Sequence, residues 1–363
     1  MSVLTFGEIM MRISPPGHLR LMQALPGSVE VIFAGGEANV AASLAMFGQP
    51  VRYLTAVPKN PITDCLVADL RRLGIDTSKM VILPKGRLGI FFLETGANQR
   101  SSNVVYDRDG STISLARPED YSFDAALEGI RWVHTTGITP ALSQNAFDSC
   151  LELVRKARAK GITVSCDLNF RKKLWRWKPG VGPNELAKEA MSQILPYVDV
   201  IIANEEDAKD VLGIEAEGTS IEAGKINAPA YTQVAAAIVT RFPSVRYVAI
   251  TLRESLSADY NNWGGMLYAA GERKSYFAPT NAQGQYEPYA IRDIVDRVGG
   301  GDSFGAGLIY AMLSSEFKDP GSAVRFAAAA SCLKHSIRGD FNYVSKDEVV
   351  ALMKGSGSGR VRR

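Results

Sequence analysis

Short apolar runs rich in Val and Ile alternate with longer amphipathic stretches along most of the chain. Strands that are buried on both faces read as nearly continuous apolar runs, so this alternation predicts a parallel sheet with helices on both faces. The predicted strands are Val3–Ile9, Val51–Val57, Trp132–Thr136, Ile162–Asp167, Val198–Ala203 and Tyr247–Thr251, with helical stretches such as 145–159 and 230–241 between them. The fold class that we expect is therefore α/β.

Two segments interrupt this alternation. Residues 12–34 and 87–115 carry strand-like patterns, among them 89–93 and 103–106, with no helical pattern between them. We expect these two segments to form a small β-sheet lid, because strands without crossover helices pair locally. The predicted division is an α/β core of residues 1–11, 35–86 and 116–354, a lid of 12–34 and 87–115, and a disordered Gly- and Ser-rich tail of 355–363.

Composition excludes several classes of protein. Hydrophobic residues are 46% of the 363 and charged residues 22%, which is typical of a folded chain that buries a core. The 41 basic and 38 acidic residues leave a net charge of +3, too balanced to predict a nucleic-acid partner. The N-terminus has no signal-peptide pattern and no apolar run reaches membrane-spanning length, so we expect no membrane partner.

The cysteines also bear on the compartment. Four of them lie far apart, without a C-x-x-C pair that would predict a zinc site or a redox dithiol: Cys65, Cys150, Cys166 and Cys332. This usage is typical of a reducing environment, so we expect a cytoplasmic protein.

The most informative motif is a run of three glycines before a predicted helix. Gly299, Gly300 and Gly301 precede Asp302 and an apolar helical pattern. Glycine lets the backbone turn tightly and bring its N–H groups close to an anion, and the positive end of the helix dipole favours the same charge. Asp302 is then either a helix cap or a base beside the bound anion, and the residues alone leave both interpretations open.

Other glycine-rich signatures fit these residues less well. The run is not a G-x-G-x-x-G motif, and no Walker A motif occurs in the chain. Residues 301–305 do match the G-x-S-x-G motif of α/β-hydrolases, with Ser303 as nucleophile and His335 as base. That motif follows a buried apolar strand, whereas residues 291–297 carry four charges, so a hydrolase is a minor alternative.

A second glycine pair opens another predicted helix. Gly35 and Gly36 are followed by apolar residues at helical spacing, and the pattern ends at Gly48. Asn39 falls in the first turn of this helix. Its amide either binds a hydroxyl of a polyol ligand or satisfies backbone groups at the helix start.

These two elements, in this order on an α/β chain, resemble the ribokinase-like, or PfkB, family of carbohydrate kinases. Arg297 and Gly300 depart from the family's more usual D-T-x-G-A-G-D form. The resemblance implies a ribokinase-like fold and ATP-dependent phosphorylation of a sugar hydroxyl by in-line transfer. It also implies that the amides of Gly299, Gly300 and Gly301 form the anion hole and that Asp302 is the base.

The resemblance further implies metal and nucleotide sites. The family's N-x-x-E segment corresponds to residues 204–207, which makes Asp207 the candidate magnesium ligand beside the ATP phosphates. Asp296, with the loop 336–340, is similar to the family's monovalent-cation region, so K⁺ is an expected cofactor. The expected nucleotide-binding residues are Asn204, Thr251, Gly301 and His335.

Polar residues at a strand end indicate the substrate. If the chain stays extended, a period of two places Asp167, Asn169 and Arg171 on one side, and Tyr106 and Arg108 share the same spacing in the lid. A guanidinium binds a carboxylate through two parallel hydrogen bonds, which a neutral sugar does not require. With the G-G-G-D variant, these residues resemble the 2-keto-3-deoxygluconate kinases, which implies phosphorylation of the terminal hydroxyl of a sugar acid. The expected substrate-binding residues are Gly35, Gly36, Asn39, Phe91, Tyr106, Arg108, Asp167, Asn169 and Arg171.

Several alternatives stay open. A kinase for a neutral sugar such as fructose or ribose, or for a nucleoside, would share every catalytic residue, and a non-catalytic sensor would share the fold. Arg108 is otherwise a solvated hairpin charge, and Arg171 a structural ion-pair partner. Phe91 stands where these kinases often have a tyrosine, so one hydroxyl contact is missing. Strand edges of the lid are able to pair with a second subunit, which predicts a homodimer.

Overall fold

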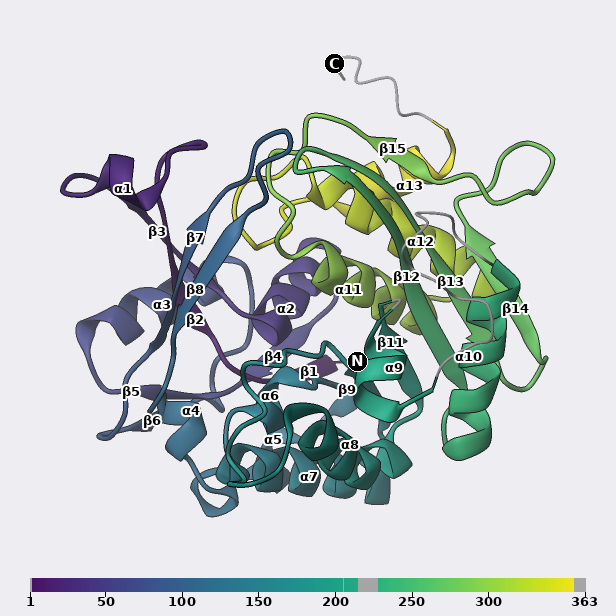
Figure 1. Cartoon of the computed structure of the whole chain (residues 1–363). Coiled ribbons are helices and arrows are strands. Elements are labelled where there is room, and N and C mark those ends of the chain that lie inside the picture. The colour runs from purple at the N-terminus through teal and green to yellow at the C-terminus, as the bar shows by residue number, and fades with distance from the viewer. Residues whose placement is uncertain (1, 205, 215–227, 356–363) are drawn as a thin grey trace.

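The computed structural model of the chain describes residues 2–204, 206–214 and 228–355. A central sheet lies between two layers of helices, and a small second sheet stands at one side (Figure 1). The predicted α/β class, with helices on both faces and a small β-sheet, is confirmed. Of the tail predicted to be disordered, only Gly355 is among the described residues.

The central sheet is mixed rather than wholly parallel. Its strand order is β14-β13-β12-β11-β10-β9-β1-β4, with β15 paired to β13. The strands are β1 (Ser2–Phe6), β4 (Val51–Leu54), β9 (Ile130–Thr136), β10 (Thr163–Asp167), β11 (Val200–Ala203), β12 (Tyr247–Ser257), β13 (Tyr260–Ala269), β14 (Lys274–Ala278) and β15 (Tyr289–Ile291). Strands from β4 to β12 run parallel, whereas β13 is antiparallel to each of its neighbours. The sequence pattern missed this antiparallel part because β13 contains Asn and Gly among its apolar residues.

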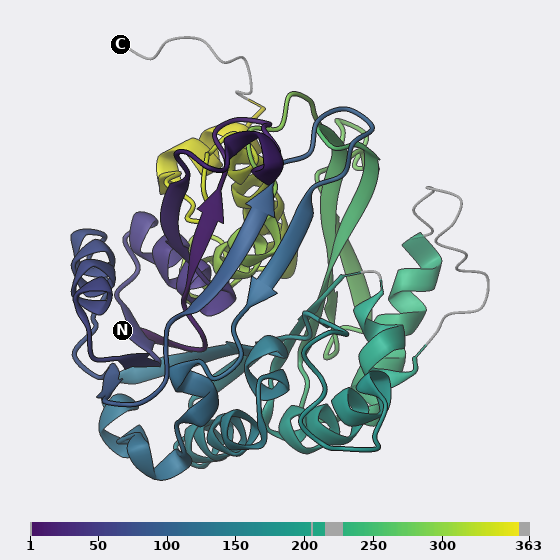
Figure 2. The ribbon, with the colours of Figure 1, turned by 60° about the vertical axis from the view of Figure 1, so that its left-hand side comes forward.

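The small sheet comes from the two segments that interrupt the βα alternation. Its strand order is β3-β2-β7-β8. Strand β2 pairs parallel with β7, whereas the β2–β3 and β7–β8 pairings are antiparallel. The strands are β2 (Met10–Ser14), β3 (Glu30–Ala34), β7 (Gly89–Glu94) and β8 (Asn103–Asp107). Figure 2 shows these strands rising beside the helices of the first layer. A further pair, β5 (Ala56–Pro58) and β6 (Val81–Leu83), is parallel.

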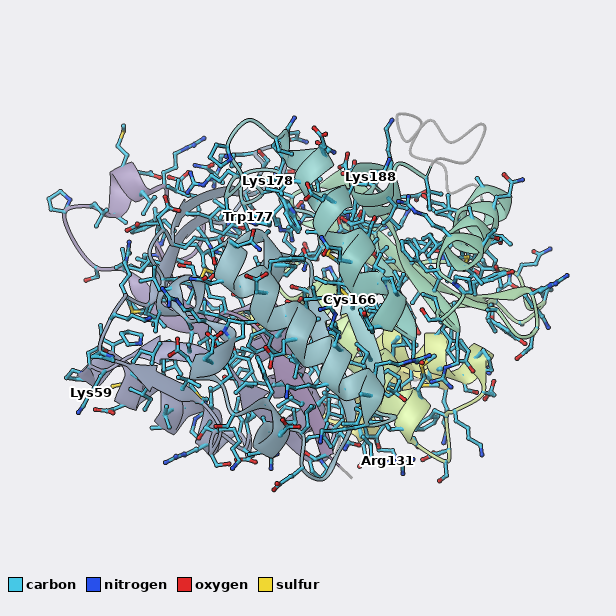
Figure 3. All side chains as sticks on the ribbon, turned by 90° about the horizontal axis from the view of Figure 1, so that it is seen from below. Lys59, Arg131, Cys166, Trp177, Lys178 and Lys188 are labelled. Carbon is cyan, nitrogen blue, oxygen red and sulfur yellow. The ribbon has the colours of Figure 1, made fainter. Side chains whose placement is uncertain are left out.

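Two hydrophobic cores hold the helices to the central sheet, one on each face. The first layer consists of α2 (Gly36–Met46), α3 (Pro61–Arg72), α11 (Gly300–Leu313), α12 (Pro320–Lys334) and α13 (Lys346–Met353). The second layer consists of α4 (Thr112–Leu115), α5 (Phe123–Ala126), α6 (Ile138–Ala141), α7 (Gln144–Ala159), α8 (Pro183–Ile194), α9 (Asp207–Leu212) and α10 (Ala228–Arg241). Seen from below, helices of the second layer lie in front of Cys166 in β10, while Lys59 and Arg131 lie at the periphery (Figure 3).

Capping residues define several helix starts. Asn60 accepts a hydrogen bond from the Thr63 N–H at the start of α3, and Ser143 accepts one from Ala146 at the start of α7. These side chains satisfy N–H groups that have no partner within the helix. Among the described residues, no helix is both long enough and apolar enough to cross a membrane.

Candidate active site

A pocket of about 560 Å³ lies between the small sheet, the C-terminal ends of the parallel strands and the start of α11. Ligands of α/β sheets bind at the carboxyl ends of the strands, so the place is the expected one. Every residue predicted for the kinase site lines this pocket except Asp296, and Ser303, the nucleophile of the hydrolase alternative, is not part of the lining either. The pocket also contains polar and aromatic residues that the sequence did not single out, among them Glu8, Glu37, Arg253, Asn261 and Trp263, and it contains Asp340 from the loop 336–340.

The glycine run forms a left-handed turn into α11. Gly299 is the N-cap of this helix and has a φ of 82°, and a Cβ there would lie 2.3 Å from the carbonyl oxygen of Asp340. Only glycine adopts this conformation at so close an approach without strain. The first N–H groups of α11 have no acceptor within the helix, and they belong to residues that line the pocket. The turn is therefore suited to hold an anion.

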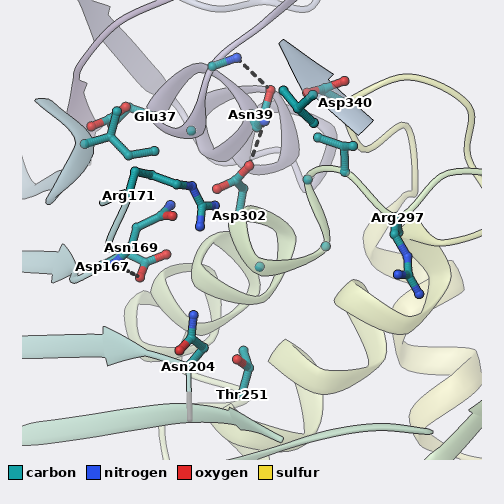
Figure 4. A pocket seen from close by; sticks show the side chains of 18 of the residues that line it. Glu37, Asn39, Asp167, Asn169, Arg171, Asn204, Thr251, Arg297, Asp302 and Asp340 are labelled. Carbon is teal, nitrogen blue, oxygen red and sulfur yellow. Dashed lines mark hydrogen bonds between the residues drawn. The ribbon is translucent and has the colours of Figure 1, made fainter. Parts of the chain in front are cut away.

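Asp302 is held by Asn39 rather than by its own helix. Its Oδ2 accepts a hydrogen bond of 2.6 Å from Asn39 Nδ2, and Asn39 Oδ1 accepts one of 3.3 Å from the Gly35 N–H. Figure 4 shows Asn39 and Arg171 pointing toward the Asp302 carboxylate. Because Gly299 is the cap and Asp302 forms no cap hydrogen bond, the helix-cap interpretation of Asp302 is wrong.

The environment of Asp302 favours its protonated form. Burial raises the pKa of Asp302 to about 6, and the nearby Asp340 carboxylate acts in the same direction. The Asn39 hydrogen bond and the Arg171 and Lys334 charges oppose this rise. A carboxyl group with a pKa near neutrality is able both to accept a proton and to release it, as a general base requires.

The glycine pair at the start of α2 lets that helix approach the strand ends. A Cβ on Gly35 would lie 2.1 Å from the carbonyl oxygen of Glu8, so no larger residue fits. A Cβ on Gly36 would lie 3.6 Å from Asp302 Oδ1. The pair therefore brings the α2 backbone and the Asn39 amide, which is only 3% exposed, against Asp302.

The prediction that Asp167, Asn169 and Arg171 lie along one side of an extended segment is wrong. The strand ends at Asp167, Asn169 has a φ of 36°, and the Asn169 N–H donates to Asp167 Oδ1 at 3.2 Å. The chain therefore turns where the period of two assumed extension. The turn still brings Asp167, Asn169 and Arg171 to the same pocket, with Arg171 exposed to it.

The structure gives Arg108 and Arg171 the opposite of the structural roles that the alternatives predicted for them. Arg108 is the structural ion-pair partner, because its guanidinium bonds to Glu8 and the two side chains are 5% and 2% exposed. Arg171 is the exposed one, and its Nη1 donates to the Phe170 carbonyl at 3.3 Å. The Arg108 guanidinium also lies over the Tyr106 ring, 5.4 Å from its centroid. Both arginines line the pocket.

Two carboxylates line the pocket beyond the ends of neighbouring strands, Asp167 at the end of β10 and Asp207 after β11. Asp207 accepts hydrogen bonds from the N–H groups of Asn204 and Phe170, at 3.0 and 2.9 Å, and burial raises its pKa. Burial, then the charges of Asp207 and Asp302, raise the pKa of Asp167 well above its ordinary value. A divalent cation would relieve this repulsion.

The described residues include no group of three or more His, Cys, Asp or Glu side chains arranged to hold a metal. Mg²⁺ commonly keeps several waters and takes its other ligands from one or two carboxylates and substrate phosphates. Asp167 and Asp207 fit such an arrangement. They do not form a metal site by themselves.

Asp296 does not fit the expected monovalent-cation site. It lies outside the pocket lining, is 4% exposed, and its Oδ2 forms an ion pair of 2.7 Å with Arg12 Nη2. Its carboxylate also accepts hydrogen bonds from the N–H groups of Val298 and Gly339. A guanidinium therefore already neutralises the carboxylate that K⁺ would require, and the expectation of K⁺ at Asp296 is not supported by the residues present.

The expected nucleotide side of the pocket is lined by Thr251 and His335. The His335 ring lies 4.9 Å from that of Trp263, and its Nδ1 is 2.8 Å from the Ser331 carbonyl. Burial lowers the pKa of His335 to about 4, so the ring is neutral near pH 7. Arg297 also lines this side, where its Nη2 donates to Asn261 Oδ1 at 2.7 Å. In the sequence, only the departure of Arg297 from the family motif had drawn attention to this residue.

The hydrolase alternative fails on geometry. Ser303 is 1% exposed and lies within α11, outside the lining of the pocket. His335, the base of that alternative, is directed to a backbone carbonyl. A nucleophile must be accessible at a strand-to-helix turn in that class of enzyme, so Ser303 is not one.

Comparison with known proteins agrees with this geometry. Residues 1–241 match the model of the pfkB family carbohydrate kinases. The chain is 29% identical to 2-dehydro-3-deoxygalactonokinase of Haloferax volcanii, over 98% of each protein. It is 43% identical to the solved 2-dehydro-3-deoxygluconokinase of Thermotoga maritima, covering 98% of this chain and 100% of that one with a TM-score of 0.87. Fructokinase of Xylella fastidiosa, solved with bound ATP, shares the fold at 19% identity, with a TM-score of 0.74 over 98% and 99% of the two chains.

The chain therefore belongs to the PfkB family of carbohydrate kinases. It is a carbohydrate kinase with a ribokinase-like fold, and several of its relatives phosphorylate 2-dehydro-3-deoxy sugar acids according to their names.

Proposed function

We propose that this kinase transfers the γ-phosphate of ATP to the terminal hydroxyl of a 2-keto-3-deoxy sugar acid, and that 2-keto-3-deoxygluconate is its substrate. The observation that carries the proposal is the position of Asp302, which shares one pocket with the glycine turn and the exposed guanidinium of Arg171. This arrangement combines an anion site, a base and a cation for a substrate carboxylate. The names of the relatives include both gluconate and galactonate epimers, so they support the class of acid more than the epimer.

In the proposed mechanism, the phosphates of ATP lie against the N-terminus of α11. The N–H groups of Gly299, Gly300 and Gly301 donate to the transferring phosphoryl group, where negative charge develops. Asp302 accepts the proton of the attacking hydroxyl as the new O–P bond forms and as the bond between the γ-phosphorus and the bridging oxygen of ATP breaks, so that ADP leaves. Asn39 holds the Asp302 carboxylate in place through the 2.6 Å hydrogen bond. Mg²⁺, when bound with ATP, would neutralise phosphate charge beside Asp167 and Asp207.

The substrate carboxylate is assigned to the arginine side of the pocket. Arg171 is exposed to the pocket, and its planar guanidinium is able to donate two parallel hydrogen bonds to a carboxylate. Arg108 also lines the pocket, but its guanidinium is oriented by Glu8 and its side chain is only 5% exposed. The net charge that Arg108 offers is offset by Glu8, which makes Arg171 the main determinant of acid recognition.

The first experiment measures ADP release with Mg²⁺ and ATP for a panel of sugars. The panel contains 2-keto-3-deoxygluconate, 2-keto-3-deoxygalactonate, fructose, ribose and adenosine. Preference for a keto-deoxy acid supports the proposal, whereas preference for a neutral sugar or nucleoside rejects the acid and keeps the kinase. No turnover with any of them would favour a sensor on the same fold.

A pair of variants tests the carboxylate contact. Arg171→Ala should raise KM for the acid much more than KM for a neutral sugar, and Lys172→Ala, which removes an exposed neighbouring charge, should change neither. Equal effects of Arg171→Ala on both substrates would reject the contact.

Asp302→Asn tests the proposed base. This variant should retain ATP and sugar binding but lose about 10²- to 10⁴-fold in kcat, the usual contribution of a general base.

The surroundings of the site belong to the proposal as well. We propose that the small sheet acts as the lid of the pocket, since Phe91 and Tyr106 line it from β7 and β8. Exposed apolar residues on the sheet, such as Val31 and Val105, support a homodimer through this sheet, which light scattering would detect. The cysteines are all unpaired, which agrees with the proposed cytoplasmic location.

A further inference from the structure

A buried cluster of four charges lies behind the glycine turn. Arg12, on strand β2 of the small sheet, bonds through Nη2 to Asp296 Oδ2 at 2.7 Å and through Nη1 to Asp340 Oδ1 at 2.6 Å. All three side chains are at most 5% exposed. Ser14 accepts a third hydrogen bond, from Arg12 Nε at 2.9 Å, which fixes the plane of the guanidinium.

The two carboxylates belong to the two loops that shape the anion site. Asp296 begins the segment that ends in the glycine turn, and it accepts hydrogen bonds from the N–H groups of Val298 and Gly339. The carbonyl of Asp340 lies against Gly299, close enough that a Cβ there would be 2.3 Å away. One guanidinium therefore joins both loops at the positions that determine the path of the Gly299 backbone.

The charge of the cluster is already balanced. Lys334 is completely buried, donates to the Ile337 carbonyl at 3.1 Å, and interacts electrostatically with both carboxylates. Two cations, Arg12 and Lys334, thus face two anions, Asp296 and Asp340. A dissolved K⁺ would add an uncompensated buried charge, or would have to displace a guanidinium that binds both carboxylates at once.

We propose that Arg12 is the resident cation of this site, and that the kinase consequently works without a dissolved monovalent cation. Arg12 acts as a positioning residue: it holds the 296–299 and 339–340 segments together, and they in turn present the glycine N–H groups to the phosphate. The inference rests on the proposed transfer at the glycine turn. It also predicts that the small sheet, which supplies Arg12, stabilises the anion site on the core.

The first test compares chloride salts of K⁺, Na⁺ and tetramethylammonium at equal ionic strength. For the unmodified enzyme, kcat, the affinity for ADP and the melting temperature should be the same in all three salts. A saturable, K⁺-specific rise in kcat, in ADP affinity or in melting temperature would overturn the proposal. If no sugar is turned over, the proposed function is rejected but the proposal about Arg12 is not, because ADP affinity and the melting temperature still test it.

The second test removes the cation. Arg12→Ala should lose about 10²-fold in kcat with little change in KM for the sugar, because misplaced catalytic groups lose rate at this scale. Low, non-denaturing concentrations of guanidinium should restore part of the lost rate, and Arg12→Lys should retain more activity than Arg12→Ala. A purely structural role predicts loss of folded protein without such rescue, and that result would contradict the assignment.

Arg338→Ala is the matched control. Arg338 also joins the small sheet to the 336–340 loop, through an ion pair of 2.6 Å with Glu30, but its side chain is 56% exposed. Surface ion pairs contribute little to stability. Its loss should therefore leave kcat, ADP binding and the salt comparison unchanged, and the same behaviour in Arg12→Ala would reject the proposal.

Discussion

The raised pKa of Asp302 leads to a quantitative prediction about how kcat/KM depends on pH. The pKa of Asp302 is raised from its ordinary 3.8 to about 6, mainly by burial, and a base must be ionised to act. About 91% of a group with this pKa is ionised at pH 7 and about 9% at pH 5. The kcat/KM of the enzyme should therefore fall about tenfold between pH 7 and pH 5. An Asp with the ordinary value would lose almost nothing in this range.

Asn39→Ala should move this profile to higher pH. The amide donates at 2.6 Å to the charged form of Asp302, so its loss disfavours ionisation. A hydrogen bond to a charged group contributes about 1.5–3 kcal/mol, and about 1.4 kcal/mol corresponds to one pKa unit. Water will replace part of the interaction, so we expect the midpoint to rise by about one unit.

The assay is the pH–rate profile of kcat/KM for the sugar acid, measured from pH 5 to 9 with Asn145→Ala as control. Asn145 is a half-buried residue of α7 that does not belong to the pocket lining, and its loss should leave the midpoint unchanged. A profile that stays at the same midpoint in Asn39→Ala would refute the positioning role of Asn39. A flat profile down to pH 5 in the unmodified enzyme would refute Asp302 as the titrating base.

Four further substitutions, one of them a control, test the structure around the site. Gly299→Ala should lower the free energy of unfolding by about 1–3 kcal/mol because of its left-handed φ, whereas Gly301→Ala, where a Cβ meets nothing within 4 Å, should not; chemical denaturation measures both. Burial raises the pKa of Glu37 from 4.5 to about 7, so stability from this group is lost as pH rises between those values. Glu37→Gln should remove this loss of stability. The melting temperature of the variant, measured from pH 5 to 8, should therefore reach or exceed that of the unmodified enzyme as the pH rises. Glu8→Gln leaves Arg108 charged and unpaired, so it should destabilise the protein by about 3–5 kcal/mol, and addition of the sugar acid should raise its melting temperature more than that of the unmodified enzyme.

Local motifs carried most of the information about the site. The glycine run and glycine pair predicted two tight turns at helix starts, because only glycine tolerates a left-handed φ at Gly299 and the 2.1 Å approach at Gly35. Backbone constraints of this kind depend on near neighbours in the chain, so they are visible in the sequence. The apolar runs predicted the parallel strands for the same reason.

Partners distant in the sequence could not be predicted in this way. Asn39 and Asp302 are 263 residues apart, and Arg12 and Asp340 are 328 apart. Nothing in the local pattern distinguishes a guanidinium that binds a substrate from one that pairs with a buried carboxylate, as Arg108 does with Glu8. The substrate role of Arg108 was inferred from spacing and from the family resemblance, and the cation role of Asp296 from that resemblance alone.

The sequence by itself determined the α/β class, the two glycine turns and the identity of the candidate base. The tertiary structure alone decided which charges are neutralised within the protein and which remain for a ligand. Asp296 is paired with Arg12, whereas Arg171 faces the pocket. Charge compensation depends on distances of a few ångströms between separate elements, and only the packing of the small sheet against the core sets those distances.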